Sequence, residues 1–395
     1  MPLCECHPGV ITRGDIVIDN ARIVTSDGVI EAGSLDIAEG RIARIREFAA
    51  GGAGCRIDAR GLLLFPGFVD IHSDAIETTI QPRPGGRFPY AMAITELDKQ
   101  LVSCGITTIY HCLSFSDPHD KTLRGYRTCA ELIREINRRA PKLRAATMIH
   151  ARFEVTETAA IPIVEALLRE GEVHLFSLMD HTPGQGQFLD VEHFRAYYGR
   201  VRGRTPAQLD TLIEERLAAR QTLDERTLRG LTTLALERGI AIASHDDDTA
   251  QKVAWVQRLG ATLSEFPVNL RAARAAHERG MAVSYGAPNV FRGASATNNL
   301  NARESIGAGY GDVICSDYAP MSLLHAALEL ERLGIAPLHE AVNMVSRNPA
   351  RAVGIAGETG SLEEGKRADL VLVDAREEVP RVVRTFVAGR EVFAS

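Results

Sequence analysis

The chain has 395 residues, 45% of them hydrophobic and 24% charged, which is typical of a globular protein with a large core and fits either one barrel with an appendage or two domains. Its formal net charge of −6 argues against a general nucleic-acid-binding surface, and the lack of any apolar run of about 18 residues argues against a membrane span. The seven scattered cysteines and the lack of a secretory-signal pattern at the start predict a cytoplasmic protein with reduced thiols.

The first predicted unit is a small β-sheet. Residues 15–58 form short β-type runs separated by glycine turn signals, and a sheet of this size needs a partner to close a core. Ahead of it, Cys4, Cys6 and His7 cluster near the start of the chain. These three residues lack a second pair at zinc-site spacing, so we interpret them as tail residues.

The next stretch runs from Leu62 through a Pro-Gly pair to His72-Ser73-Asp74. We interpret it as one buried strand with a kink and a polar tip. Side chains two residues apart in a strand point to the same side, so His72 and Asp74 project together. One imidazole and one carboxylate can begin a metal site, although such pairs also occur in ordinary polar networks.

From Leu62 onward, predicted strands alternate with helices. The charged, helix-prone segment 186–226 exceeds the usual connection length and is expected to be a helical insertion. A doubly wound open sheet would concentrate polar strand tips at one switch point, whereas nearly every strand here has a polar tip, which favours a (β/α)8 barrel. The eight predicted strands are 62–72, 106–111, 143–155, 173–179, 240–244, 261–267, 281–286 and 312–316, and two helices are expected to close the unit.

The C-terminal segment returns to β-type runs over residues 360–395, which are the natural partners of residues 15–58. We therefore predict an α/β fold in two parts. Residues 62–354 form a (β/α)8 TIM-type barrel, and residues 1–61 and 355–395 together form a small β-sandwich.

Several motifs together resemble the amidohydrolase superfamily. The run from Pro66 to Asp74 is similar to its opening metal motif, although most members carry His-x-His, and the run from Gly360 to Val371 resembles its C-terminal sheet signature. Further motifs resemble one branch, the PhnM-type alpha-D-ribose 1-methylphosphonate 5-triphosphate diphosphatases of the carbon–phosphorus lyase pathway. They are His72-Ser-Asp-Ala-Ile-Glu77 with Pro82-Arg-Pro-Gly85, His150-Ala-Arg-Phe-Glu154, Met179-Asp-His-Thr-Pro-Gly-Gln185, Ser244-His-Asp-Asp247, Glu265-Phe-Pro267, Gly286-Ala-Pro-Asn289 with Arg292-Gly293, and Ser316-Asp-Tyr318 with Leu323-Leu-His325.

The resemblance implies a metal-dependent enzyme of phosphonate catabolism that cleaves a ribose 5-triphosphate to the 5-phosphate and pyrophosphate. The implied cofactor is one or two divalent ions, Zn²⁺ first, with Mn²⁺ or Fe²⁺ as alternatives. The implied partner is a small phosphorylated sugar, and a homodimer stays open. The same scaffold could instead serve a C–N hydrolase (a deacetylase, cyclic amidase or deaminase) or a metal-binding protein without catalysis.

Six residues at strand ends are the predicted metal ligands. His72 and Asp74 follow from the first strand, and His181 and His245 follow the fourth and fifth strands as neutral nitrogen donors. Because no lysine stands at a predicted strand end, Glu154 is the candidate to bridge two ions, with a salt bridge to Arg152 as the alternative. The sixth strand carries Glu265 where a histidine is expected, which leaves the ligands of a second ion open. The sixth ligand is Asp317.

The superfamily pattern also makes Asp317, at the end of the eighth strand, the predicted catalytic residue. A bound metal lowers the pKa of its water to about 7, so an adjacent carboxylate can accept the proton. A triphosphate also needs cations, and arginine matches phosphate oxygens bidentately. The predicted substrate contacts are Arg83, Arg152, Asn289, Arg292 and His325. High cation density near the strand tips would favour a triphosphate over an amide substrate.

Overall fold

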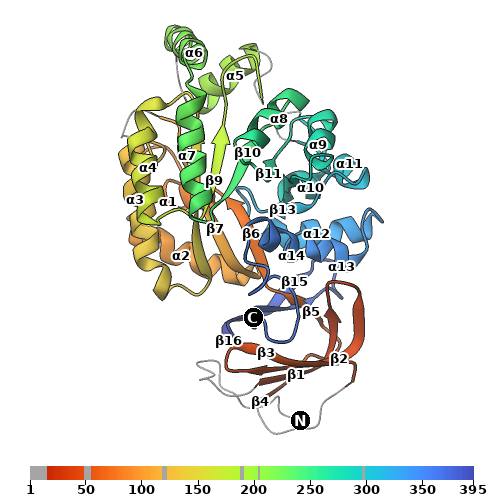
Figure 1. The fold of residues 1–395 in the computed structure, drawn as a ribbon. Coiled ribbons are helices and arrows are strands. Elements are labelled where there is room, and N and C mark those ends of the chain that lie inside the picture. The colour runs from red at the N-terminus through yellow and green to blue at the C-terminus, as the bar shows by residue number, and fades with distance from the viewer. Residues whose placement is uncertain (1–15, 49–54, 118–121, 187–190, 203–204, 296–298) are drawn as a thin grey trace.

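The structure is a computed structural model that describes residues 16–48, 55–117, 122–186, 191–202, 205–295 and 299–395. The cluster of Cys4, Cys6 and His7 lies outside the described residues. The described strands form two eight-stranded sheets, drawn one above the other in Figure 1. Within the described ranges, no helix is both long and apolar enough to cross a membrane.

The larger unit is built on eight strands that lie side by side in chain order, as the sequence predicts. An isolated parallel bridge between Ser73 and Asp317 brings the end of the last strand beside the first. The strands are β6 (Phe68–Ser73), β7 (Ile106–Phe115), β8 (Ala146–Glu154), β9 (Leu175–Met179), β10 (Ala241–His245), β11 (Leu263–Glu265), β12 (Ala282–Gly286) and β13 (Val313–Cys315). The α/β barrel fold is therefore confirmed.

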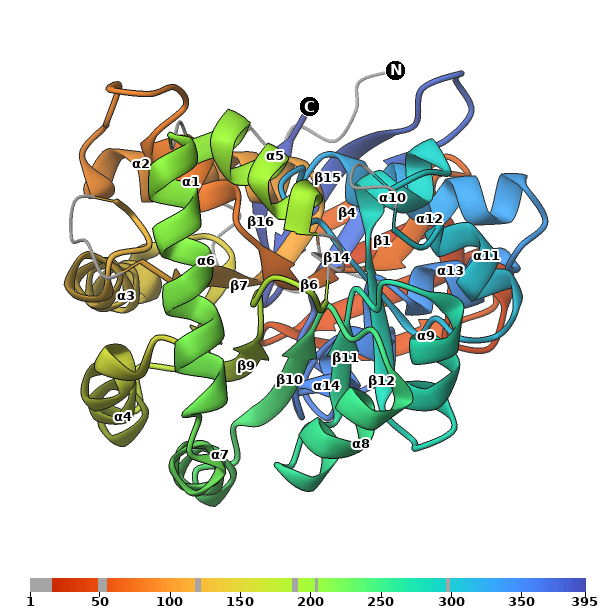
Figure 2. The same cartoon turned by 90° about the horizontal axis from the view of Figure 1, so that it is seen from above.

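Helices surround these strands, as Figure 2 shows from above. Helix α3, for example, buries the apolar side chains of Leu132, Ile133 and Ile136. Three helices follow the last strand, where the sequence predicts two. The helices are α1 (Ala75–Ile80), α2 (Tyr90–Ser103), α3 (Tyr126–Arg139), α4 (Ile161–Glu170), α7 (Glu225–Glu237), α8 (Ala250–Arg258), α9 (Leu270–His277), α10 (Ala287–Arg292), α11 (Ala302–Gly307), α12 (Ser322–Arg332), α13 (Leu338–Asn343) and α14 (Arg347–Ala352), with 3₁₀ turns at Ala140–Lys142 and Thr158–Ala160.

Two further helices, α5 (Val191–Arg202) and α6 (Pro206–Gln221), lie between β9 and α7. Thr205 starts α6 with a capping box, because its side chain accepts from the Gln208 backbone and the Gln208 side chain accepts from the Thr205 backbone. Proline at the first position of α6 fits this start. The two helices project over the carboxyl ends of the barrel strands (Figure 1).

The second sheet joins the two ends of the chain. Its strands are β1 (Ile16–Val24), β2 (Val29–Ala38), β3 (Arg41–Arg46), β4 (Cys55–Asp58), β5 (Leu63–Pro66), β14 (Leu370–Asp374), β15 (Arg381–Val387) and β16 (Arg390–Ala394). Strand β5 pairs parallel with β1 and antiparallel with β14, so it connects the N-terminal and C-terminal halves. Both halves contribute side chains to one apolar cluster that includes Ile18, Leu35, Leu64, Leu372 and Phe386.

The single kinked strand expected from Leu62 to His72 is wrong. Strand β5 belongs to the terminal sheet, and β6 starts the barrel two residues later, at Phe68. Gly67 is the residue between them, and a Cβ at this position would collide with the Thr107 side chain. The backbone N–H of Gly67 donates to the Asp369 carbonyl at 2.8 Å, which ties the turn to the terminal sheet.

Candidate active site

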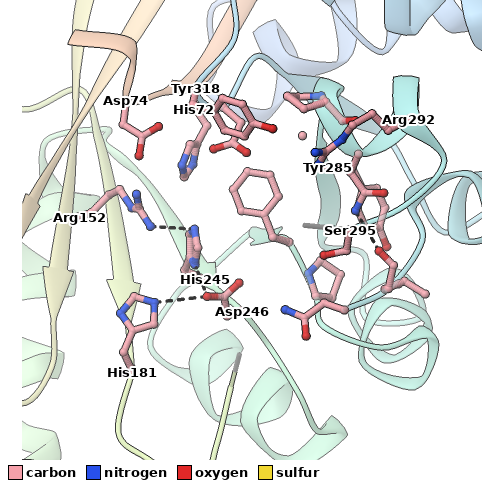
Figure 3. Close-up of a pocket in the computed structure, with 18 of the residues that line it drawn as sticks. His72, Asp74, Arg152, His181, His245, Asp246, Tyr285, Arg292, Ser295 and Tyr318 are labelled. Atoms are coloured by element: carbon pink, nitrogen blue, oxygen red, sulfur yellow. Dashed lines mark hydrogen bonds and ion pairs between the residues drawn. The ribbon is translucent and has the colours of Figure 1, made fainter. Parts of the chain in front are cut away.

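A cavity of about 360 Å³ opens at the carboxyl ends of the barrel strands. Its lining combines charged groups of both signs with a few apolar side chains, as Figure 3 shows. The histidine, aspartate and arginine residues of the lining are His72, His181, His245, Asp74, Asp246, Asp317, Arg124, Arg152 and Arg292. A concave site of this size, with convergent polar groups at one end of a barrel, is the usual place for an active site.

Three residues within two positions of the ends of barrel strands enter the cavity from a strained backbone. Asp246, Phe266 and Asp317 have positive φ angles of 53°, 52° and 57°. Such a conformation costs a non-glycine residue on the order of 1–3 kcal/mol and is retained only where the surroundings enforce it. Here a neighbouring strand holds each backbone N–H. Asp246 donates to the Glu265 carbonyl at 2.9 Å, Phe266 donates to the Ser284 carbonyl at 3.0 Å, and Asp317 donates to the His72 carbonyl at 2.9 Å. The turn directs each side chain into the cavity.

The first polar group consists of His72, Asp74 and Asp317. His72 donates Nδ1–H to Glu265 Oε1 at 2.8 Å, which leaves a lone pair on Nε2. Burial, with a smaller contribution from Arg152, lowers the pKa of His72 to about 3, so the imidazole is neutral. Oδ1 of Asp74 is buried without a hydrogen-bond partner among the described residues. This group offers unused nitrogen and oxygen donors.

Asp317 lies next to Asp74, because the Asp74 backbone N–H donates to the Asp317 carbonyl at 3.0 Å. Burial and then the charge of Asp74 raise the pKa of Asp317 to about 8. A cation placed between the two side chains would offset the effect of the Asp74 charge on Asp317. Arg124 Nη2 approaches Asp74 Oδ2 only to 3.7 Å, and it also pairs with Glu77 at 3.0 Å.

The second polar group is a row of contacts from β8 to β10. Arg152 Nη2 lies 2.9 Å from His245 Nε2, and His245 Nδ1 lies 3.0 Å from Asp246 Oδ2. Asp246 Oδ2 is 3.3 Å from His181 Nε2. His181 Nδ1 is 2.8 Å from Glu154 Oε2, and the His181 backbone N–H also donates to Glu154. Glu154 is fully buried and does not line the cavity.

The neighbouring charges determine which histidine of this row favours its protonated form. Burial opposes protonation of His181, but the adjacent Glu154 and Asp246 raise the pKa of its imidazole. Burial likewise opposes ionisation of Asp246, but His245 and His181 lower the pKa of its carboxyl far below its usual value. Burial lowers the pKa of His245 to about 4. His181 is therefore the histidine of this row that favours a positive charge.

The predicted substrate contacts divide into two sets. Arg152, Asn289 and Arg292 line the cavity, whereas Arg83 and His325 do not. Arg83 lies in an exposed turn, and the half-buried His325 stands on α12 beside the Phe291 ring, 6.0 Å away. The Asn289 side chain is engaged within the wall, donating to the Leu300 carbonyl at 2.9 Å and accepting from the Ala302 N–H at 3.1 Å.

Sequence reasoning missed several residues of the site. Asp246 follows the predicted ligand His245 directly, so its position at a strand tip was a usable signal. Arg124 lies in the connection between β7 and α3, where no strand-end pattern marks it. Phe266 places its ring 4.8 Å from the His72 ring and 5.1 Å from the His245 ring, and it makes the apolar side of the cavity.

Deeper in the barrel, Glu265 links the first group to the β-sheet. It accepts from Ser177 Oγ at 3.0 Å as well as from His72. His150 Nδ1 lies 3.0 Å from the Ile71 carbonyl and 3.1 Å from Cys112 Sγ. Three sets of described residues are close enough to hold a metal ion: His72, Cys112 and His150; His72, His245 and Glu265; and His181, His245 and Asp246.

A model described as the amidohydrolase family matches residues 125–392 of the chain. The chain is 34% identical over 384 residues to the alpha-D-ribose 1-methylphosphonate 5-triphosphate diphosphatase of Escherichia coli (strain K12), covering 96% of this chain and 100% of the relative. It is 24% identical over 406 residues to a 5'-deoxyadenosine deaminase of Methanosarcina mazei, covering 92% and 85%. Among solved structures, N-acetylglucosamine-6-phosphate deacetylase from Pasteurella multocida matches with a TM-score of 0.62 at 14% identity, over 96% of this chain and 100% of that one. This last likeness concerns the fold alone.

Proposed function

This chain belongs to the amidohydrolase family, and we propose that it hydrolyses alpha-D-ribose 1-methylphosphonate 5-triphosphate to the 5-phosphate and pyrophosphate. The observation that carries the proposal is the 34% identity to the Escherichia coli diphosphatase along that protein's whole length. The substrate is a small phosphorylated sugar of phosphonate catabolism, and the proposed location is the cytoplasm.

The charge of the cavity supports a polyanionic substrate. Arg124, Arg152 and Arg292 all line it. Arg152 and Arg292 approach from different sides (Figure 3), so their guanidinium groups can contact different phosphoryl groups of one triphosphate. A C–N hydrolase on an uncharged amide or base has no need of three arginines in its cavity, which makes that alternative the weaker one.

Amidohydrolases are generally metal-dependent, and the donors present here fit a divalent ion. We propose that its ligands come from His72, Asp74, Glu154, His181, His245 and Asp317, because His72 and His245, and likewise His181 and His245, belong to groups of described residues whose ligand atoms lie close together. One or two ions are proposed, Zn²⁺ first, with Mn²⁺ or Fe²⁺ as alternatives. When bound, such an ion activates water and polarises a phosphoryl oxygen.

The chain's own residues supply the remaining parts of the reaction. Asp317, directed into the cavity by its positive φ angle, accepts the proton of the attacking water. The arginines stabilise the negative charge of the triphosphate while the bond to phosphorus breaks. Pyrophosphate is a stabilised leaving group, so charge stabilisation matters more than a strong acid opposite the water.

Phosphorus NMR of the metal-loaded protein tests the proposal. The protein is incubated with the ribose 1-methylphosphonate 5-triphosphate, with ATP and with an N-acyl amino sugar in parallel. Pyrophosphate from the first substrate is the expected product. Orthophosphate would mean that a different phosphoryl group is attacked, and deacylation of the sugar without any phosphate release would overturn the proposed reaction.

A further inference from the structure

Arg292 lies across the cavity from the residues whose ligand atoms are close enough to hold a metal ion. Those groups include His72 with His245, and His181 with His245 and Asp246. Figure 3 shows Arg292 on the other side of the cavity from these residues. In the proposed reaction, the phosphoanhydride that is hydrolysed must lie among the metal-binding groups. Arg292 therefore faces a part of the substrate that is away from the reacting phosphorus.

The guanidinium of Arg292 is held in place and keeps donors for a ligand. Arg292 ends α10, and its Nε donates to the Pro288 carbonyl at 3.1 Å. Arg303 Nε donates to the Val290 carbonyl at 2.6 Å and Arg303 pairs with Glu329 at 3.0 Å, so the end of this helix is fixed. Residues 286–303 contain no aspartate or glutamate, and among the described residues no carboxylate forms an ion pair with Arg292. Its two Nη groups can therefore bind an anion.

Apolar side chains line the cavity between its metal-binding side and Arg292. They are those of Phe266, Pro267, Pro288 and Leu300. The Phe266 ring lies 4.8 Å from the ring of His72, so this wall begins next to the metal-binding groups. A chain of charged phosphoryl groups would lose hydration against such a wall without compensation, whereas a neutral ribose ring would lose less. The wall therefore favours a sugar, and not the polyphosphate, between the metal-binding groups and Arg292.

We propose that Arg292 binds the phosphonate at the anomeric end of the substrate and so selects a ribose 1-phosphonate over a ribose whose anomeric substituent is uncharged, as in ATP. This inference rests on the proposed function. A methylphosphonate ester combines one negative charge with a methyl group, and Arg292 combines a cation with the buried Pro288 beside it. Arg124 and Arg152, which also line the cavity, remain for the triphosphate.

Calorimetric titration of the metal-loaded protein tests the proposal without turnover. The two ligands are alpha-D-ribose 1-methylphosphonate 5-phosphate and methyl alpha-D-ribofuranoside 5-phosphate, which lacks only the phosphonate. Wild type is expected to bind the first ligand about 10–100-fold more tightly, as one charge-assisted pair predicts. R292M should reduce this preference to about threefold or less, and R292K should keep part of it. The matched control R271M changes an exposed arginine of α9 outside the cavity lining and should keep the full preference.

R152M provides the contrast at the other side of the cavity. Both ligands carry the 5-phosphate, so R152M should weaken both by the same factor and leave the preference intact. The proposal is overturned if wild type shows no preference for the phosphonate, or if R292M folds by circular dichroism and keeps that preference. It is also overturned if R292M weakens both ligands equally, which would assign Arg292 to the 5-phosphate end. Failure of the proposed hydrolysis would instead appear in the phosphorus NMR experiment, because none of these titrations requires turnover.

Discussion

Asp317 combines three properties that fit a proton acceptor. It has a strained backbone with φ of 57°, it lines the cavity in a half-buried position, and it lies next to Asp74. In D317N the amide keeps an oxygen that can face a metal but cannot accept a proton. We expect metal content to be unchanged and kcat to fall by about 10²–10⁴-fold, the usual contribution of a general base.

Steady-state kinetics and metal analysis of the same preparation measure both effects of D317N. The matched control is D27N, which makes the same change at an exposed position in the turn between β1 and β2. Turnover near the wild-type level in D317N would remove this side chain from the chemistry. Loss of metal together with activity would make it chiefly a ligand.

His111 provides a test of acid sensitivity. It is buried at 3% exposure, and burial lowers its pKa from the ordinary 6.5 to about 4. Because the folded pKa is below the unfolded one, the folded state excludes the proton. The stability is therefore complete above pH 6.5 and is lost as pH falls from 6.5 towards 4. At pH 5 the loss from this one residue is about 2 kcal/mol.

Replacing His111 by Asn removes this titration. We expect the difference in free energy of unfolding between pH 7.5 and pH 5, measured in urea, to be smaller in H111N than in wild type by about 2 kcal/mol. The other buried histidines are the same in both proteins and contribute equally to the pH dependence of stability, so the difference between wild type and H111N isolates His111. An unchanged pH dependence would mean that His111 titrates alike in the folded and unfolded states.

At the scale of elements, periodicity predicted most of the barrel and the polar strand ends predicted much of the site. His72, Asp74, His181, His245 and Asp317 all lie in the cavity. Glu154 is the predicted ligand that does not line the cavity. It ends β8, but its carboxylate contacts His181 at 2.8 Å. Sequence spacing gives the strand on which a side chain stands, whereas its direction depends on contacts with neighbouring strands.

Other differences between the predicted and observed positions have the same physical origin. Arg83 follows the first barrel strand, yet it lies in an exposed turn, because a loop of this length can fold away from the strand ends. Arg124 enters the cavity from a connecting segment whose path depends on its ion pair with Glu77. The division between β5 and β6 was missed because a Pro-Gly pair in an apolar run marks a kink and a change of sheet equally well.

Helix α6 acts on the site through the segment that carries His181. Arg220 Nε lies 2.7 Å from Asp180 Oδ2, and Arg216 Nη1 donates to the His181 carbonyl at 3.2 Å. Asp180 is 3% exposed, so loss of Arg220 would leave a buried carboxylate without this ion pair. We expect R220M to lower the free energy of unfolding by about 1–3 kcal/mol and to loosen the segment after β9.

Hydrogen exchange over residues 180–186 and a thermal melt measure the effect of R220M. The matched control is R195M, whose ion pair with Asp210 lies within the insertion. The carboxylate of Asp210 is far more exposed than that of Asp180, so R195M should cost no more than about 1 kcal/mol. Equal exchange in wild type and R220M would show that α6 does not hold this segment. Equal effects of R220M and R195M would assign the change to the insertion as a whole.

At the scale of the whole molecule, one sheet made from both chain ends is fixed to a barrel that lies between them in sequence. The composition predicted this arrangement, since β-type runs at the two ends need each other to close a core. The joint itself was not predictable, because it depends on a contact between residues 40 positions apart, Gly67 and Thr107. Strand β5 lies in one sheet and β6 in the other, so a displacement at Gly67 moves the two sheets relative to each other.

We therefore expect G67A to destabilise the protein by about 1–3 kcal/mol, since the added methyl group overlaps the Thr107 side chain in a packed joint. Truncating the neighbour should relieve part of the overlap, so the double variant G67A/T107A should be less destabilised than the sum of the single variants. Thermal melts of the four proteins complete this cycle, and G357A, where a Cβ meets nothing within 4 Å, is the matched control. Additive effects in the cycle would show that the backbone shifts away from Thr107.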